Sequence, residues 1–157
     1  MNGVMADQER DFKRFWQYRE GVAESLLAGH DVHQEDVSVP IARLAEFYST
    51  VHARYADAFP SFQVFFFGHI GDGNLHIFIQ KPESMSRQEF LTATQASDLE
   101  LFKVLSQFKG SVSAEHGIGL LKRHALSFTR TSTEIELMRG LKHVFDPQGL
   151  LNPGKLI

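Results

Sequence analysis

Apolar side chains recur every three or four residues in four segments of the sequence, which is the spacing of an amphipathic α-helix. The first segment is rich in aromatic residues and is broken by Ala-Gly-His-Asp at 28–31, and the second ends before Pro60. Ser86, with a glutamate nearby, has the character of a helix N-cap. The pattern therefore predicts helices over residues 6–28, 42–59, 86–108 and 132–145.

Between these helices the sequence has the alternating or continuous apolar character of β-strands. Residues 62–70 and 75–80 are the strongest candidates, and Asp72-Gly73 between them is a signal for a two-residue hairpin turn. Shorter strands are predicted at 36–41 and 110–115. The resulting order of strand, helix, strand, strand, helix, strand is that of a ferredoxin-like domain. We therefore expect an α+β fold: a ferredoxin-like antiparallel sheet with helices on one face, an N-terminal helix, and a C-terminal helix and tail.

The predicted turn brings two histidines together. With Asp72 and Gly73 at its tip, His69 lies directly opposite His76, and opposed Cβ atoms are about 4.5–5.5 Å apart. Because side chains alternate between faces, the strands have a polar and aromatic face and an aliphatic face. The first carries Asp36, Ser38, Phe65, Phe67, Phe78, Ser111, Ser113 and Glu115 with the histidines. The second is expected to meet the helices and carries Val37, Val39, Val64, Phe66, Ile70, Leu75, Ile77, Ile79, Val112 and Ala114.

Composition narrows the class of protein. The 157 residues fit one domain over 1–157, with the ferredoxin-like core at about 36–116. The net charge of −3 without a basic block argues against nucleic acid as a partner, and the lack of cysteine excludes disulfides and thiolate chemistry. No apolar run reaches the roughly 18–20 residues that cross a bilayer, and the charged N-terminus does not resemble a signal peptide. We expect a cytoplasmic protein.

The paired histidines are candidates for a metal site. Zinc-like ions in catalytic sites take three protein ligands and leave one position open. Glu115 is the natural third ligand beside His69 and His76, although in a ferredoxin-like sheet another strand separates it from His76. Histidines with a purely structural role are the alternative, and the sequence alone leaves both open.

Three further residues are candidates for other roles. His116 follows Glu115 at a predicted strand end, where an imidazole is suited to general-base catalysis; an ordinary strand-to-loop turn is the alternative. Arg19 lies on the first helix and Asn152 in the tail. Without further information, Arg19 is expected on a solvated helix face and Asn152 in a C-terminal segment packed for stability.

Three motifs in this order resemble the C-terminal domain of FAD-linked oxidases. They are GHIGDGNLH at 68–76, SAEHGIG at 113–119 and DPQGLLNPGK at 146–155, and the resemblance extends over about residues 12–157. The family includes D-lactate dehydrogenase, glycolate oxidase and D-2-hydroxyglutarate dehydrogenase. Its members combine a flavin-binding domain with a cap that holds the substrate, and they oxidise D-2-hydroxy acids to 2-oxo acids.

The resemblance implies a role for each candidate residue. His69, His76 and Glu115 would hold a divalent metal, often zinc, and His116 would take the proton of the substrate hydroxyl while hydride leaves for FAD. Arg19 would pair with a substrate carboxylate. Asn152 would lie in the tail segment that approaches the flavin. The protein is expected in the cytoplasm, and its electron acceptor is what could bring it to the periphery of a membrane.

The sequence also departs from the family pattern. Hydroxyglutarate-specific members carry threonine, lysine and asparagine at the positions of Ala23, Gln34 and Phe78, which favours a substrate with a smaller or apolar tail here. The alternative for Phe78 is contact with the flavin-binding domain. No flavin-binding domain is present in these 157 residues, so the chain alone is expected to be inactive and to need a flavin-binding domain or subunit. The alternative is a free-standing metal- or ligand-binding module that forms homo-oligomers through the open sheet face.

Overall fold

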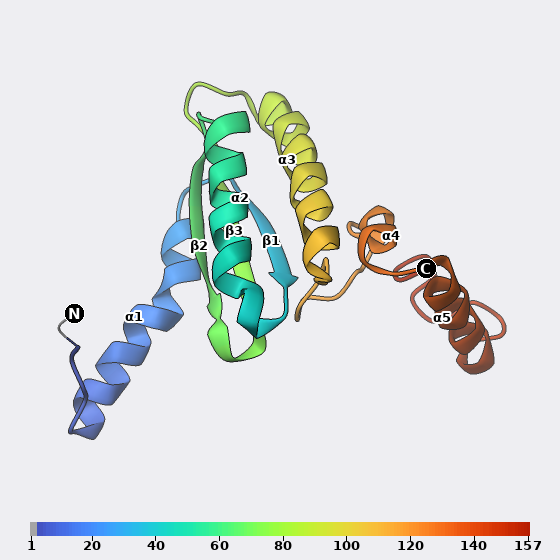
Figure 1. The fold of residues 1–157 in the computed structure, drawn as a ribbon, viewed down its shortest axis with the longest axis horizontal. Helices are drawn as coiled ribbons and strands as arrows, with labels where there is room; N and C mark the ends of the chain where they lie inside the picture. The colour runs from blue at the N-terminus through green and yellow to red at the C-terminus, as the bar shows by residue number, and fades with distance from the viewer. Residues whose placement is uncertain (1–2) are drawn as a thin grey trace.

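The computed structural model describes residues 3–157, and it confirms the α+β class and the antiparallel sheet (Figure 1). The sheet has the strand order β1-β3-β2. The strands are β1 (Val32–Ser38), β2 (Gln63–His69) and β3 (Asn74–Gln80). The longer helices are α1 (Glu9–Leu27), α2 (Leu44–Ala58), α3 (Arg87–Phe108) and α5 (Ser132–Phe145), with a short α4 (Leu126–Thr129) between the last two.

Helices α2 and α3 cover one face of the sheet, as the alternation of side chains predicts (Figure 1). The aliphatic side of β3 is buried against them through Leu75, Ile77 and Ile79. Val37 and Val39 join the same core from β1 and the segment after it. Burial of these side chains orients the sheet, so the face with His76 is the one that the two helices leave free.

The terminal helices extend away from this core. In Figure 1, α1 passes behind the sheet near β2 and runs outward, and α5 lies beyond α4 on the other side. Neither helix contains a buried residue. Among residues 3–157, no helix combines the length and the apolar character that a membrane crossing requires.

The predicted N-cap of α3 is confirmed. The hydroxyl of Ser86 accepts a hydrogen bond from the backbone N–H of Glu89 at 3.2 Å, and the Glu89 carboxylate accepts one from the Ser86 N–H at 2.8 Å. This reciprocal capping box satisfies two backbone donors that the helix itself cannot pair.

Replacing Ser86 with alanine is expected to lower the free energy of unfolding by about 1 kcal/mol, because one of these donors loses its partner. Urea denaturation measures the change. Ser106→Ala, in the last turn of the same helix, is the matched control and should stay within about 0.5 kcal/mol of the parent. Equal losses in both variants would show that the cap contributes nothing.

The fourth strand, predicted at 110–115, is reduced to one antiparallel bridge between Ser38 and Ser111. The bridge stands beside β1, which is where a ferredoxin-like sheet places its last strand. Beyond it the backbone donors of residues 114–116 bond to the side chain of Asp36 instead of to a neighbouring strand. The strand prediction was wrong because these donors find a carboxylate partner.

The predicted hairpin register was also wrong. The connection is a 3₁₀ turn, Ile70–Asp72, followed by Gly73 at φ +67°, so His69 pairs with Asn74 and Phe67 pairs with His76. A Cβ at Gly73 would lie 2.0 Å from the carbonyl oxygen of Val39, which explains the need for glycine there. The shift is by an even number of residues, so both histidines remain on the predicted face.

Two smaller differences accompany this turn. Ile70 belongs to the turn and is 76% exposed, so its assignment to the aliphatic face was wrong. The first strand begins at Val32, four residues before the predicted start at 36, and ends at Ser38. The prediction missed the earlier part because polar residues interrupt the apolar pattern there.

Candidate metal and substrate site

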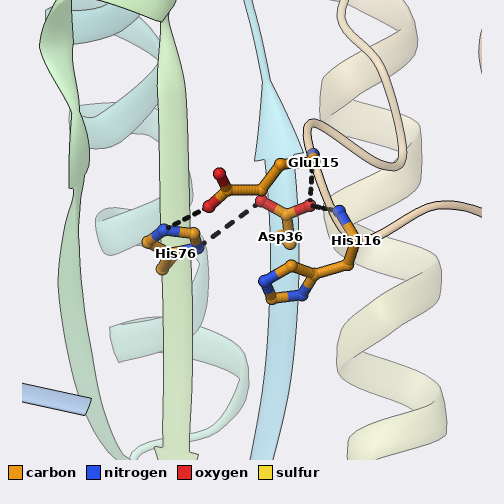
Figure 2. Close-up of side chains that lie close together, drawn as sticks. All are labelled: Asp36, His76, Glu115 and His116. Atoms are coloured by element: carbon orange, nitrogen blue, oxygen red, sulfur yellow. Dashed lines mark hydrogen bonds and ion pairs between the residues drawn. The ribbon is translucent and has the colours of Figure 1, made fainter.

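Three distant parts of the chain meet around His76 on the sheet face opposite α2 and α3 (Figure 2). Asp36, His76, Glu115 and His116 each offer an atom within 4.8 Å of the others. Nε2 of His76 is 3.1 Å from Oε1 of Glu115, and Nδ1 of His76 is 3.4 Å from Oδ1 of Asp36. The rings of His76 and His116 are stacked with their centroids 5.7 Å apart.

The Asp36 carboxylate holds the segment that carries Glu115 and His116. Its Oδ2 atom accepts hydrogen bonds from the N–H groups of Ala114, Glu115 and His116 at 3.0, 2.8 and 2.9 Å. Its Oδ1 atom accepts one from Nδ2 of Asn74 at 2.7 Å. Burial raises the pKa of Asp36, but these bonds lower it by more, so the pKa lies below its usual value. Asp36 is thus an ionised, buried anchor.

The turn end of β2 brings His69 and Arg19 to the same place. Nη2 of Arg19 donates to the carbonyl oxygen of Gly68 at 3.3 Å and is also 3.3 Å from Nε2 of His69. Because a guanidinium can only donate, this contact gives Nε2 of His69 the acceptor role. The same Nε2 is 3.9 Å from Oε1 of Glu115. The guanidinium also lies over the ring of Phe67, 5.6 Å from its centroid.

The structure brings together five of the six predicted site residues: Arg19, His69, His76, Glu115 and His116. The separation of Glu115 from His76 by a strand is overcome because Asp36 holds the backbone of residues 114–116 beside β1 and the Glu115 side chain reaches over that strand toward His76 (Figure 2). Asn152 is kept apart from this group. Its side chain accepts a hydrogen bond from Lys155 in the segment after α5.

The donor set fits a divalent cation of the zinc type. Ligand atoms about 2.0–2.2 Å from a tetrahedral ion lie roughly 3.3 Å apart. Oε1 of Glu115 is 3.1 Å from Nε2 of His76 and 3.9 Å from Nε2 of His69, so His69 has to move closer and release Arg19 to bind the same ion. The side chains of His69 and Glu115 are 48% and 50% exposed, so both have room to adjust. Burial, with the neighbouring His116 and His69, lowers the pKa of His76, which favours the neutral imidazole that a metal requires.

Asp36 is better suited to orient a ligand than to be one. Its two oxygens already face three backbone donors, Asn74 and Nδ1 of His76. A carboxylate beside the outer nitrogen of a ligating histidine is the usual means of fixing the ring and directing the other nitrogen toward the metal. Sequence reasoning placed Asp36 on the polar face but gave it no role. The available signal was an acidic residue inside a strand, on the same face as the histidines.

A second cluster on the helix-covered face is satisfied by its own members. Nε2 of His33 is 2.7 Å from Oδ1 of Asp98 on α3 and 3.7 Å from Oε1 of Glu35. Oε2 of Glu35 is 2.7 Å from Nζ of Lys122. Acidic and basic groups alternate along this chain of contacts, so each has an opposite partner within 3.7 Å, and the cluster is a partly buried ion-pair network around the buried Glu35.

This network predicts a pH dependence of stability. Burial alone would lower the pKa of His33, but the hydrogen bond and charge of Asp98, with Glu35, raise it above its usual value. A raised pKa means that protonated His33 stabilises the fold below about pH 6.5 and that this contribution is lost as pH rises through the folded-state pKa. The difference in unfolding free energy between the parent and His33→Gln should therefore be larger at pH 6 than at pH 9.

Urea denaturation at the two pH values measures that difference. His143→Gln, at an exposed position of α5, is the control and should give the same small difference at both. A His33→Gln difference that does not change with pH would contradict the assigned charge state.

Comparison with known proteins agrees with the resemblance that the three sequence motifs indicate. The family model for FAD linked oxidases, C-terminal domain, matches residues 1–156. The chain is 46% identical to D-2-hydroxyglutarate dehydrogenase of Xanthomonas citri pv. viticola and 37% identical to that of Stutzerimonas stutzeri, over 99% of this chain and 33% of each relative. It is 33% identical to the mitochondrial D-2-hydroxyglutarate dehydrogenase of Bos taurus, over 99% of the chain and 27% of the relative. The chain thus spans about a third of the length of these relatives.

Proposed function

Because the chain belongs to the family of FAD linked oxidases, C-terminal domain, we propose that it forms the substrate and metal half of an FAD-dependent enzyme that oxidises a D-2-hydroxy acid to a 2-oxo acid. The observation that carries the proposal is the convergence of His69, His76 and Glu115 with Arg19 and His116 on one sheet face. The names of the relatives point to the same reaction class.

In this proposal each residue of the site has a distinct task. His69, His76 and Glu115 hold a divalent cation, with zinc as the first candidate because of the nitrogen and oxygen donors. Arg19 lies close enough to these ligands to pair with the substrate carboxylate. A cation held there would polarise the 2-hydroxyl of the substrate, and a flavin supplied by the partner would take the hydride from C2.

His116 is the proposed general base. Its ring stacks on that of the proposed ligand His76, and its backbone is fixed by Asp36. From there the imidazole takes the hydroxyl proton of the substrate as the carbonyl forms. Asp36 holds the base and, through His76, one of the ligands, so a single buried carboxylate sets the geometry of both.

The residues around His76 also indicate which kind of substrate side chain the site would accept. Phe67 lies next to His76, and Phe78 is 4% exposed with its ring 4.9 Å from that of Phe67. Phe78 is buried and offers no surface to a substrate, so the half-buried ring of Phe67 is the apolar contact that supports a substrate with a small or apolar tail. The names of the relatives instead point to hydroxyglutarate, so D-lactate and D-2-hydroxyglutarate are the two substrates to compare first.

The flavin would be supplied by a partner domain or subunit. Helix α5 exposes apolar side chains at successive turns, with Leu137, Leu141 and Val144 at 64%, 61% and 73% exposure. Exposed apolar stripes of this kind are typical of surfaces that pack against another protein part. We propose that this stripe contacts the flavin-binding partner.

The test is anaerobic reduction of the flavin in the enzyme that contains this chain. Excess D-2-hydroxy acid should bleach the bound flavin, and the L enantiomer should not. His116→Gln should slow the reduction by about 100-fold or more because the base is lost. His143→Gln is the matched control and should not slow it. Failure of every D-2-hydroxy acid to reduce the flavin would overturn the proposed function.

A further inference from the structure

Lys122 is a largely buried cation that contacts three oxygen atoms. Its Nζ atom is 2.7 Å from Oε2 of Glu35, and it donates to the carbonyl oxygens of Val112 at 3.0 Å and Asp36 at 3.3 Å. The Lys122 side chain is 14% exposed and that of Glu35 is 5% exposed. A lysine is rarely buried to this extent unless it is paired. The contacts with Glu35, Val112 and Asp36 therefore hold the Lys122 ammonium group in this position.

The contacts of Lys122 link the two ends of residues 112–122, the segment that carries Glu115 and His116. Val112 lies at the start of that segment and Lys122 at its end, so the bond between them joins the two ends. Within the segment, Gly117 and Gly119 have φ of +80° and +55°, and no strand pairing fixes the backbone after Ser111. Side-chain contacts are therefore what determines where this segment lies.

Two adjacent residues of β1 hold the segment from opposite faces. Glu35 and Asp36 point to opposite sides of the sheet because side chains alternate along a strand. Asp36 binds the backbone of residues 114–116 on the free face, and Glu35 binds Lys122 on the helix-covered face. The segment thus passes around the edge of β1 and is attached on both sides of it.

We propose that Lys122, paired with Glu35, is a positioning residue that fixes Glu115 and His116 against His76. The proposal deepens the proposed function, since it concerns the placement of a ligand and of the base. It assigns Lys122 no contact with substrate or metal. The ion pair with Glu35 keeps Nζ where it reaches both carbonyl oxygens, and these bonds restrict the path of the segment.

The experiment compares three variants of the chain. Lys122→Met removes the cation and leaves the buried Glu35 carboxylate with only His33, 3.7 Å away, so it is expected to lower stability as well. Lys122→Met combined with Glu35→Leu replaces the pair by apolar groups of similar size, which commonly preserves stability. Lys103→Met is the matched control, because Lys103 contacts only an exposed carboxylate, that of Glu100, in a surface pair.

Amide hydrogen exchange gives the decisive readout. In the double variant, exchange at Glu115 and His116 should become at least about tenfold faster, while that of the core amides Ile77 and Leu105 stays near the parent value. Lys103→Met should change neither group. Equal acceleration at all four amides would show a purely structural role, and unchanged exchange at Glu115 and His116 would show none; either result overturns the proposal.

Zinc binding to the same variants is an independent readout. The double variant should bind zinc about 10–100-fold more weakly than the parent, which is the usual effect of disturbing groups that orient a ligand. A parent chain that does not bind zinc would contradict the metal assignment in the proposed function. The exchange measurement would still decide the role of Lys122, so the two failures are distinguishable.

Discussion

Replacing Asp36 with alanine is expected to lower the free energy of unfolding by about 3 kcal/mol, because a buried charged acceptor of several hydrogen bonds is removed. The N–H groups of residues 114–116 and the amide of Asn74 all lose their partner at once. The segment that carries Glu115 and His116 should detach from β1, so the site should be lost together with the stability. Urea denaturation and amide exchange at residues 114–116 measure the two effects.

Ser38→Ala is the matched control for Asp36→Ala. Ser38 lies two residues further along the same strand and face, and its backbone bridges to Ser111 next to the same segment. It should lose less than about 0.5 kcal/mol. A loss below about 1 kcal/mol in Asp36→Ala, with unchanged exchange at residues 114–116, would contradict the anchoring role.

The contribution of Asp36 should also depend on pH. Its folded-state pKa is lowered, so its stabilisation is present above its unfolded pKa of about 3.9 and is lost as pH falls through the folded-state value. The difference in stability between the parent and Asp36→Ala is therefore largest near neutral pH and narrows below about pH 4. A difference that grows under acid conditions would contradict the ionised, hydrogen-bonded carboxylate.

Zinc binding should be lost when a proposed ligand is removed. His76→Ala and Glu115→Gln are each expected to weaken zinc affinity by more than about 100-fold, since changes in orienting groups alone cost about 10–100-fold. His69→Ala should do the same. The measurement is isothermal titration of the purified chain with zinc, accompanied by metal analysis.

His143→Ala is the control for the ligand variants, because His143 is an exposed histidine of α5. It should bind one zinc ion as the parent does. Equal zinc affinity or content in the parent, His69→Ala and His76→Ala would contradict the metal site.

Periodicity alone predicted much of this fold. The helix predicted at 86–108 is observed at Arg87–Phe108, and the one at 132–145 is observed at Ser132–Phe145. The faces of the sheet were predicted because alternation depends only on parity, so His69 and His76 share a face despite the wrong register. The first two motifs contain His69, His76, Glu115 and His116, which the structure brings close together on that face.

The remaining features depend on contacts that no local pattern encodes. The segment after Ser111 leaves the sheet because its donors bond to Asp36, which precedes them by about 80 residues. The longer turn at Ile70–Asp72 depends on the close approach of Gly73 to Val39. Local propensity predicts a strand at residues 110–115 and a two-residue turn at Asp72-Gly73, and tertiary contacts override both predictions.

The central claim is that this sheet face supplies the metal and the base for oxidation of a D-2-hydroxy acid by a bound flavin. The most direct test is the rate of anaerobic flavin reduction by the D-2-hydroxy acid in the enzyme containing this chain, measured before and after treatment with a chelator. We expect the reduction to be lost on chelation and restored by zinc or another divalent cation. An enzyme shown to be metal-free that reduces its flavin at the untreated rate would contradict the account.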